Sequence, residues 1–282
     1  MFWPGSLNSS PDFYEFYLVL NVRPLMQFAL VNCQRHPPQP RLRGACPACA
    51  QEAISKCGSR ILWHWAHHGR RHCDPWWENE TEWHRAWKAQ FPEAMREVVH
   101  FDDATGEKHV ADVKTSRGLV IELQHSAMPP EELQSREKFY GRMIWIVDGK
   151  SFAAQFEVFK YPLPHPESAL LQDVVFYHQT GGAAFWRRSE ASEGSTLVPF
   201  HGSSEITDEI MTNYRGHHFF RWKQPRKVWI EATAPVFIDF GSDELIRLLS
   251  YAQSGQWCVQ RIAKRALVEK NGGTYLARAG GR

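Results

Sequence analysis

Asp112 and Glu122 are the two residues whose type and spacing point most directly to chemistry. Both lie in residues 109–126, HVADVKTSRGLVIELQHS, where apolar and polar residues alternate on either side of a short polar break, and this pattern predicts a β-hairpin. If residues 116–118 form a three-residue loop with Gly118 in the left-handed conformation, Asp112 lies directly opposite Glu122. Cross-strand partners are about 5 Å apart at Cβ, so the two carboxylates could hold one divalent cation.

Gln124 follows Glu122 on the same face of the predicted hairpin. The opposite face is apolar and is expected to be buried; its residues are Ala111, Val113, Ile121 and Leu123. Two neighbouring carboxylates repel each other, which favours a function that depends on their proximity, such as metal binding. The spacing alone leaves open that both acids lie on a solvated sheet face.

A helix is predicted before these strands, within residues 75–96, and Thr81 can serve as its N-cap. Two stripes recur at positions i, i+4 and i+8: an apolar stripe of Trp83, Trp87 and Phe91, and a polar stripe of Glu80, His84 and Lys88. The apolar stripe is expected to pack on the sheet. The polar stripe is either a solvated face with supporting charge pairs or a face that supplies the hairpin with a third acidic ligand or a proton carrier.

The surrounding elements predict a layered α/β core. A strand in residues 97–101 precedes the hairpin, and a helix in residues 130–140 follows it, with Pro129 and Pro130 suited to its first turn. Residues 143–147 form a continuous apolar run that is typical of a fully buried strand. The order is therefore helix, three strands, helix and strand.

Five of the six cysteines lie between Cys33 and Cys73, interleaved with histidines. This clustering, without a recognisable secretory signal, favours a metal site in a reducing compartment over disulfides. Short strands in residues 53–56 and 61–65 would form a ribbon that brings a second pair of ligands back to a Cys-Pro-Ala-Cys pair, which has the spacing of a zinc knuckle. The expected ligands of a structural Zn²⁺ are Cys46, Cys49, His67 and Cys73, with Cys57 as the main rival.

Two other uses of these cysteines are disfavoured. A redox Cys-x-x-Cys normally lies in a βαβ unit, and the pattern for such a unit is missing here. A catalytic zinc keeps an open coordination position, whereas four candidate protein ligands leave none. We therefore expect a structural metal.

The composition of the 282 residues is that of an ordinary globular protein, with 43% hydrophobic residues and a formal net charge of +2. Nucleic-acid binding through overall positive charge is thereby excluded, so any such surface must be a local basic patch. Most of the 12 tryptophans are expected in the core, although aromatic side chains can also stack on bases. No apolar run reaches the length of a membrane span, and we expect a cytoplasmic protein.

Several ordered motifs within residues 26–150 resemble the competence protein CoiA-like nuclease family, of the PD-(D/E)XK nuclease superfamily. They are CPAC, HWAH, CDPWWENETEWHRAWK, HVADV, VIELQHS, REKFYG and MIWIVDG. The resemblance implies a restriction-endonuclease-like core behind a cysteine-containing N-terminal module, acting on DNA, single-stranded or duplex, with Mg²⁺ or Mn²⁺. It further implies a role in bacterial DNA processing, in transformation or in defence against foreign DNA.

Matching positions imply that Asp112 and Glu122 are the metal-binding acids and that Gln124 replaces the usual Lys. On the first helix the residues that match the family are Glu80, His84 and Lys88. A neutral amide can orient a water or a phosphate oxygen but cannot offset charge as Lys would. Gln124 therefore motivates an alternative, a catalytically weak or inactive DNA-binding or adaptor protein on the same fold.

Four regions are expected along the chain: a peripheral extension (1–25), a strand and zinc-ribbon-like module (26–75), the nuclease core (76–150) and an accessory α+β region (151–282). In the last region, residues 243–253 look helical, and His217 and His218 are expected at the surface. Basic residues interleaved with aromatics form a candidate DNA surface, although they could equally be the outer face of a packed sheet. The candidate DNA-contacting residues are Arg70, Arg71, Lys88, Arg221, Lys223, Arg226 and Lys227.

Overall fold

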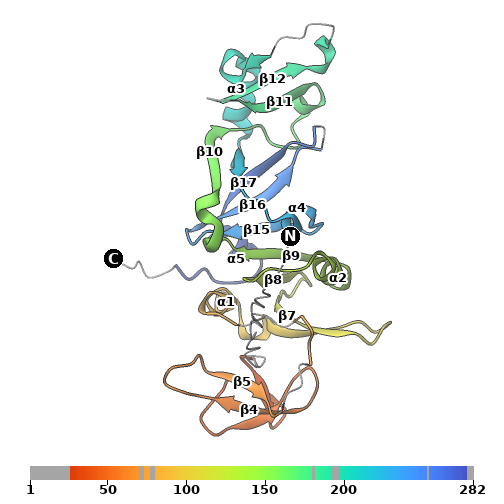
Figure 1. Ribbon diagram of the computed structural model, residues 1–282, viewed down its shortest axis with the longest axis vertical. Helices are drawn as coiled ribbons and strands as arrows, with labels where there is room; N and C mark the ends of the chain where they lie inside the picture. The colour runs from red at the N-terminus through yellow and green to blue at the C-terminus, as the bar shows by residue number, and fades with distance from the viewer. Residues whose placement is uncertain are drawn as a thin grey trace, which may run out of the picture.

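The computed structural model describes residues 26–69, 73–76, 80–179, 182–191, 197–252 and 254–277. They form an elongated molecule of mixed α+β structure in which three sheets follow one another along the long axis (Figure 1). The expected α+β class is confirmed. The peripheral extension expected in residues 1–25 lies outside the described residues. Among the described helices, none has the length and apolarity needed to cross a membrane.

The sheet at the N-terminal end has five antiparallel strands, in the order β2-β1-β3-β4-β5. The strands are β1 (Ala29–Val31), β2 (Gln34–His36), β3 (Arg43–Ala45), β4 (Glu52–Lys56) and β5 (His64–His67). The ribbon strand expected in residues 53–56 is present as β4, whereas the one expected in residues 61–65 begins later and is β5. Trp65 is fully buried and its indole N–H donates to the carbonyl of His36, so this sheet has a small core of its own.

The central sheet has nine strands in the order β10-β14-β17-β16-β15-β9-β8-β7-β6. The strands are β6 (Arg96–Phe101), β7 (Lys108–Lys114), β8 (Val120–Gln124), β9 (Met143–Asp148), β10 (Phe156–Pro162), β14 (His217–Trp222), β15 (Val236–Asp239), β16 (Glu244–Ser250) and β17 (Trp257–Ala263). The three strands β8, β9 and β15 are parallel, and the other pairs are antiparallel.

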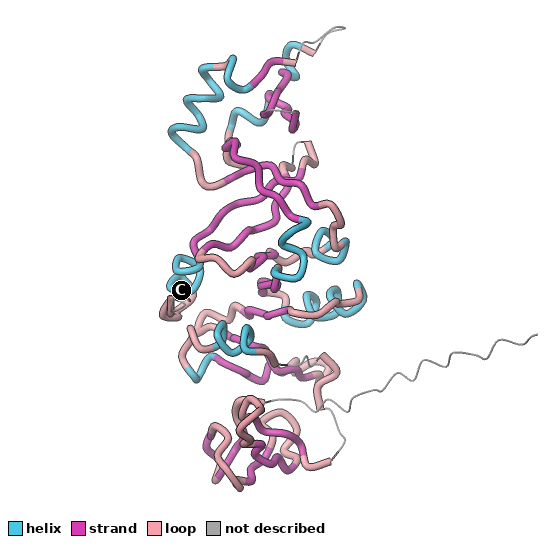
Figure 2. Tube along the Cα trace, turned by 60° about the vertical axis from the view of Figure 1, so that its left-hand side comes forward, coloured by secondary structure: helices cyan, strands magenta, loops and turns pink. Residues whose placement is uncertain are grey.

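Helices cover both faces of this sheet (Figure 1, Figure 2). Their bounds are α1 (Glu82–Lys88), α2 (Pro130–Tyr140), α4 (Lys227–Glu231) and α5 (Lys264–Lys270). Trp83 and Trp87 of α1 pack with α5 on one face, and Leu133 of α2 packs with Trp229 of α4 on the other. The order of helix, three strands, helix and strand predicted for residues 76–150 is present as α1, β6, β7, β8, α2 and β9.

The hairpin of β7 and β8 has the expected register. Gly118 takes a φ of +76°, its N–H donates to the carbonyl of Thr115, and the N–H of Thr115 donates to Leu119. Val113 pairs with Ile121, so Asp112 lies opposite Glu122 one position farther from the loop. Glu122 is only 4% exposed, so the alternative that both acids lie on a solvated face is wrong.

A third sheet lies at the far end, with strands β11 (Val174–Gln179), β12 (Gly182–Arg187) and β13 (Val198–Pro199) and the helix α3 (Ser204–Asn213). Its core includes Leu171, Phe176, Phe185 and Ile206 and also side chains of β14 and β17. This end of the molecule therefore packs directly on the central sheet.

Three expectations for residues 151–282 need correction. The sheet does not stop at residue 150, because β15 pairs in parallel with β9 and five of its nine strands follow that residue. Residues 244–250, expected as helix, form β16 between β15 and β17, because burial between two strands outweighs helical leucine spacing. His217 and His218, expected at the surface, are 1% and 5% exposed because β14 is covered on both sides.

Candidate active site and metal centre

Three acidic residues lie side by side on three adjacent strands. Glu97 of β6 is opposite Asp112 of β7, and Asp112 is opposite Glu122 of β8. The backbone N–H of Asp112 donates to Oε1 of Glu122 at 3.2 Å, and Oδ2 of Asp112 accepts from the N–H of Leu123 at 3.0 Å. These contacts fix the two hairpin acids in place.

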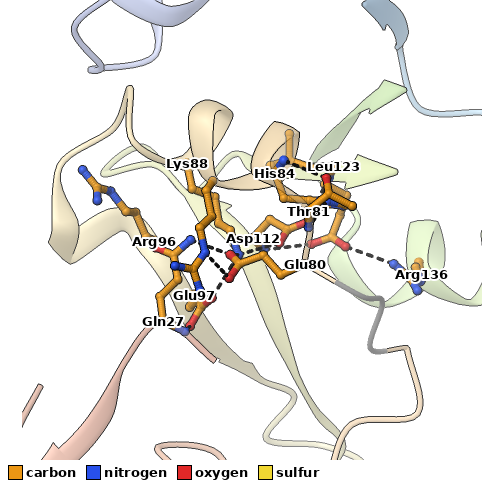
Figure 3. Close-up of polar contacts among 12 residues, drawn as sticks. Gln27, Glu80, Thr81, His84, Lys88, Arg96, Glu97, Asp112, Leu123 and Arg136 are labelled. Atoms are coloured by element: carbon orange, nitrogen blue, oxygen red, sulfur yellow. Dashed lines mark hydrogen bonds and ion pairs between the residues drawn. The ribbon is translucent and has the colours of Figure 1, made fainter. Parts of the chain in front are cut away.

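Helix α1 adds Lys88 to this row of acids. Its Nζ lies 2.6 Å from Oε1 of Glu80, 2.9 Å from Oε1 of Glu97 and 3.5 Å from Oδ1 of Asp112 (Figure 3). Lys88 is 3% exposed. Burial disfavours its charged form, but Glu97, Glu80 and Asp112 together outweigh burial and raise the pKa of the ammonium group far above its usual value. Lys88 is therefore a permanent cation within the cluster.

Gln27, two residues before β1, closes the cluster from the side of the N-terminal sheet. Its backbone N–H donates to Oε2 of Glu97 at 2.8 Å, and its side-chain Nε2 donates to Oε1 of Glu80 at 2.5 Å. Burial would raise the pKa of Glu80, but Lys88 and Arg85 hold it below its usual value. Glu97 has a φ of +45°, an uncommon conformation for a residue other than glycine, and such strain is often found at functional sites.

Glu122 has a different environment from the other acids. Its Oε2 lies 3.2 Å from Nη1 of Arg136 on α2. Burial, followed by the negative charge of Asp112, raises the pKa of Glu122 to about 8 against the opposing charge of Arg136. A divalent cation placed between Asp112 and Glu122 would favour the charged form, so metal binding at neutral pH is expected to release a proton.

Of the two other predicted site residues, His84 and Gln124, only His84 lines the cavity. His84 lines the cavity, and its Nδ1 forms a capping box with Thr81 at the start of α1, accepting from the backbone N–H at 3.2 Å. Gln124 is 3% exposed and its Nε2 lies 3.4 Å from the carbonyl of Ser126. It does not line the cavity, so it does not take the position that a catalytic Lys would need.

The acids face a cavity of about 90 Å³ between the N-terminal sheet and the central sheet, enough for several waters. The same cavity is also lined by Cys46, His67 and Cys73. The carboxylate cluster and the Cys/His group therefore share one cavity, although the sequence assigns them to different modules.

The Cys/His group could hold a metal ion. Each of Cys46, Cys49, His67 and Cys73 offers one ligand atom, and these four atoms lie within 4.8 Å of one another. The two sulfurs of Cys46 and Cys73 are 3.7 Å apart, close to the ~3.8 Å edge expected of a tetrahedron with Zn–S bonds of about 2.3 Å. Cys57, the rival ligand, is not in the group. The hydrogen bond with Cys73 lowers the pKa of Cys46 to about 5, which favours a thiolate.

The expected DNA-contacting residues of the C-terminal half lie away from the acids. Arg221 is on β14, six strands along the sheet from β7, which at the usual strand spacing is roughly 29 Å. Lys223, Arg226 and Lys227 follow it directly in the chain. None of the four lines the cavity of Asp112. Arg70 and Arg71 lie outside the described residues.

Sequence reasoning did not identify Glu97, Gln27 and Arg136 as parts of the site. For Glu97 a signal was present: residues 102–107, DDATGE, have the composition of a turn, and pairing β6 with β7 outward from it brings Glu97 opposite Asp112. Gln27 and Arg136 carry no such signal, because their contacts depend on how the N-terminal sheet and α2 are placed.

Comparisons with protein-family models, with curated proteins and with solved structures find no match for this chain. The resemblance of the sequence motifs to CoiA-like nucleases therefore stays a prediction. The described residues themselves supply two features, a buried acidic row with one lysine and a group of four metal-ligand side chains, and both face one cavity.

Proposed function

We propose that the protein is a Mg²⁺- or Mn²⁺-dependent deoxyribonuclease that hydrolyses phosphodiester bonds in bacterial DNA processing. The observation that carries this proposal is the placement of Asp112 opposite Glu122 at a cavity that both residues line. Two carboxylates at this spacing suit a hard divalent cation, which prefers oxygen ligands. The raised pKa of Glu122 fits the same role, because a carboxylate that lacks a full counter-charge gains most from binding a cation.

In this proposal the residues around the cavity have separate roles. Asp112 and Glu122 would hold the cation, which would supply polarisation of the scissile phosphate and a lowered pKa of the attacking water. Glu80 reaches the same cavity from the start of α1 and is placed as a third acidic neighbour. Arg136 holds Glu122 from the α2 side, and the N–H of Leu123 holds Asp112, so both acids stay oriented.

Lys88 supplies the positive charge that Gln124 cannot. A Lys at position 124 would offset charge from the end of β8, whereas this chain has a neutral amide that does not reach the cavity. The Nζ of Lys88 is instead within 3.5 Å of Asp112. We assign to Lys88 the positioning of Asp112 and the offsetting of the acids' own charge, because its ammonium group already contacts three carboxylates.

For the Cys/His group we propose a structural Zn²⁺. Four protein ligands fill a tetrahedral zinc, so no coordination position is open for a substrate. The ion would tie the loop after β3 and residue Cys73 to β5, and thereby hold the N-terminal sheet, with Gln27, against the acidic cluster.

The direct test is degradation of end-labelled single-stranded and duplex DNA with and without Mg²⁺ or Mn²⁺. We expect cleavage that requires the metal and that falls at least about 100-fold in Asp112→Asn, because each such group contributes several kcal/mol. Glu131→Gln, which removes an exposed acid of α2, is the matched control and is expected to cleave as the parent does.

One observation favours the alternative of a non-cleaving DNA-binding or adaptor protein. The acids of the cluster already have cationic partners, Lys88 for Glu80 and Glu97 and Arg136 for Glu122. Such a cluster could be stable without a metal. Binding of DNA with no cleavage in Mg²⁺ or Mn²⁺, and no heat of Mn²⁺ binding at the acids, would favour this alternative.

A further inference from the structure

A second hollow lies on the outer side of the acidic cluster, where α1 and β6 meet the N-terminal sheet. It is an open groove of about 450 Å³. Its lining combines apolar and cationic side chains, chiefly Phe28, Pro37, Pro38, Trp63, Arg85 and Arg96. Glu93 also lines it and Glu80 pairs with Arg85, so the excess of positive charge comes from Arg96 together with the nearby Arg35. None of the DNA-contacting residues expected from the sequence lies here.

The two arginines are held in place by backbone carbonyls. Arg85 donates from Nη2 to the carbonyl of Trp63 at 2.6 Å, and Arg96 donates from Nε to the carbonyl of Phe91 at 2.7 Å. Within the described part of the chain, Nη1 of each arginine has no hydrogen-bond partner. Arg35 adds a third guanidinium close by, since its Nη2 donates to the carbonyl of Arg96. Cations fixed in this way suit a ligand with repeated negative charges.

Trp63 adds an aromatic surface to this cationic groove. It is 45% exposed, although its Nε1 donates to the carbonyl of Gly58 at 3.2 Å, so the indole is both accessible and held in one orientation. Ile61, in the same loop, is 50% exposed. An exposed, fixed indole beside cations is the combination with which proteins bind single-stranded nucleic acid, because every unpaired base offers a face for stacking.

The groove and the acidic cavity are separated by a thin wall. Phe28 lines both, and Gln27 lines the groove while its amide contacts Glu80. Arg85 also lines the groove, and its Nε donates to Oε2 of Glu80 at 2.8 Å. Figure 3 shows Arg96 at the end of the cluster opposite to Arg136, on the side of Gln27. A chain lying in the groove would therefore pass directly beside the acids.

We propose that this groove binds a single strand of DNA, with phosphates at Arg85 and Arg96 and an unpaired base on Trp63. The inference rests on the proposed function for the identity of the ligand as DNA. A duplex offers no free base to the indole, so single strands should bind more tightly than duplexes. An acidic protein segment would match the charge but would gain nothing from base stacking.

The test measures binding separately from cleavage. Fluorescence anisotropy of labelled oligo-dT is followed in the Glu122→Gln background without added Mg²⁺ or Mn²⁺, so failure of the nuclease proposal leaves the binding result readable. Trp63→Ala should weaken binding about 5- to 150-fold, and Trp63→Phe should restore most of it. Arg96→Gln should flatten the salt dependence by about 0.7 units of slope.

Matched controls come from elsewhere on the surface. Phe101→Ala removes an aromatic side chain that is 54% exposed at the end of β6, and Arg265→Gln removes an exposed charge of α5; neither should change binding. In the parent, light-induced crosslinking of oligonucleotides that carry 5-iodouracil should reach Trp63, a readout that needs no variant. Unchanged binding by Trp63→Ala, crosslinks only at other residues, or displacement of oligo-dT by polyglutamate of equal charge would overturn the proposal.

Discussion

Glu97 and Asp112 face each other across β6 and β7, and both contact the ammonium group of Lys88, at 2.9 Å and 3.5 Å. They differ in their other contacts. Glu97 also accepts the backbone N–H of Gln27, whereas the side chain of Asp112 is 23% exposed toward the cavity. Asp112 is therefore the acid that can turn to a divalent cation while Lys88 stays bound to Glu97 and Glu80.

Replacing Lys88 should destabilise the fold strongly. Lys88→Met keeps the length of the side chain but leaves Glu80 and Glu97 buried without their shared cation, which costs about 3–5 kcal/mol for a broken buried pair. The loss should be smaller at pH 5 than at pH 8, because protonation of the acids relieves it. Urea unfolding of the parent and of Lys88→Met at pH 5 and at pH 8 measures the loss of stability at each pH. Lys138→Met, on the exposed side of α2, should change stability little; an equally stable Lys88→Met protein would contradict the buried cluster.

The raised pKa of Glu122 gives a stability prediction with a definite sign. Between the unfolded pKa near 4.3 and the folded value of about 8, the folded protein binds more protons than the unfolded chain, so stability falls as pH rises through this range. Glu122→Gln lacks this effect. Its stability relative to the parent should therefore increase from pH 5 to pH 9, by about 4 kcal/mol. Urea unfolding at four pH values measures the difference, and parallel curves for the parent, Glu122→Gln and the Glu131→Gln control would refute it.

Zinc content tests the Cys/His group. The purified protein should contain about one zinc per chain, and Cys46→Ser should lose both the metal and the cooperative melting of the N-terminal sheet, because binding energy in such modules is folding energy. Cys57→Ser is a matched control in the same sheet region and should keep the metal. Metal analysis by mass spectrometry measures the zinc content of the parent and of each variant. Retained zinc in Cys73→Ser with loss in Cys57→Ser would reverse the ligand assignment.

The contacts of Asp239 lead us to expect that the two halves of the chain fold together. This fully buried acid accepts the indole N–H groups of Trp83 and Trp87 on one oxygen and Nζ of Lys264 on the other, at 2.6 Å. Asp239→Asn should lower the free energy of unfolding by about 3–5 kcal/mol, whereas Asp208→Asn on the exposed side of α3 should not. A chain ended at residue 150 should show no cooperative melting, and a stable fragment of that length would contradict the continuous sheet.

The hairpin was predictable because its information is local. Period-two alternation and a glycine at the left-handed loop position set the register of Asp112 and Glu122 without help from the rest of the chain. The capping residue Thr81 and the stripe of Trp83 and Trp87 located α1 in the same way. The group of Cys46, Cys49, His67 and Cys73 was also the expected one, although the spacing left Cys57 open as a rival.

The remaining features depend on contacts between distant segments. Residues 244–250 have a leucine spacing that suits a helix, yet they form a strand because β15 and β17 lie on either side. His217 is buried because the core of the third sheet packs on its face of β14 and the ring of His165 contacts it, which its own sequence does not reveal. Likewise, Gln27 enters the acidic cluster only when the N-terminal sheet packs against α1, so no local pattern could have marked it.

The most direct test of the central claim is the rate of DNA cleavage by Glu122→Gln at saturating Mn²⁺, compared with the parent at equal protein concentration. The substitution keeps the shape of the side chain and removes the charge that would hold the metal beside Asp112. We predict at least an about 100-fold loss of rate, with a folded protein by circular dichroism and unchanged zinc content. Cleavage at the parent rate, with the activity co-eluting with the protein through a further chromatographic step that removes contaminating nuclease, would place the chemistry elsewhere and contradict the proposal.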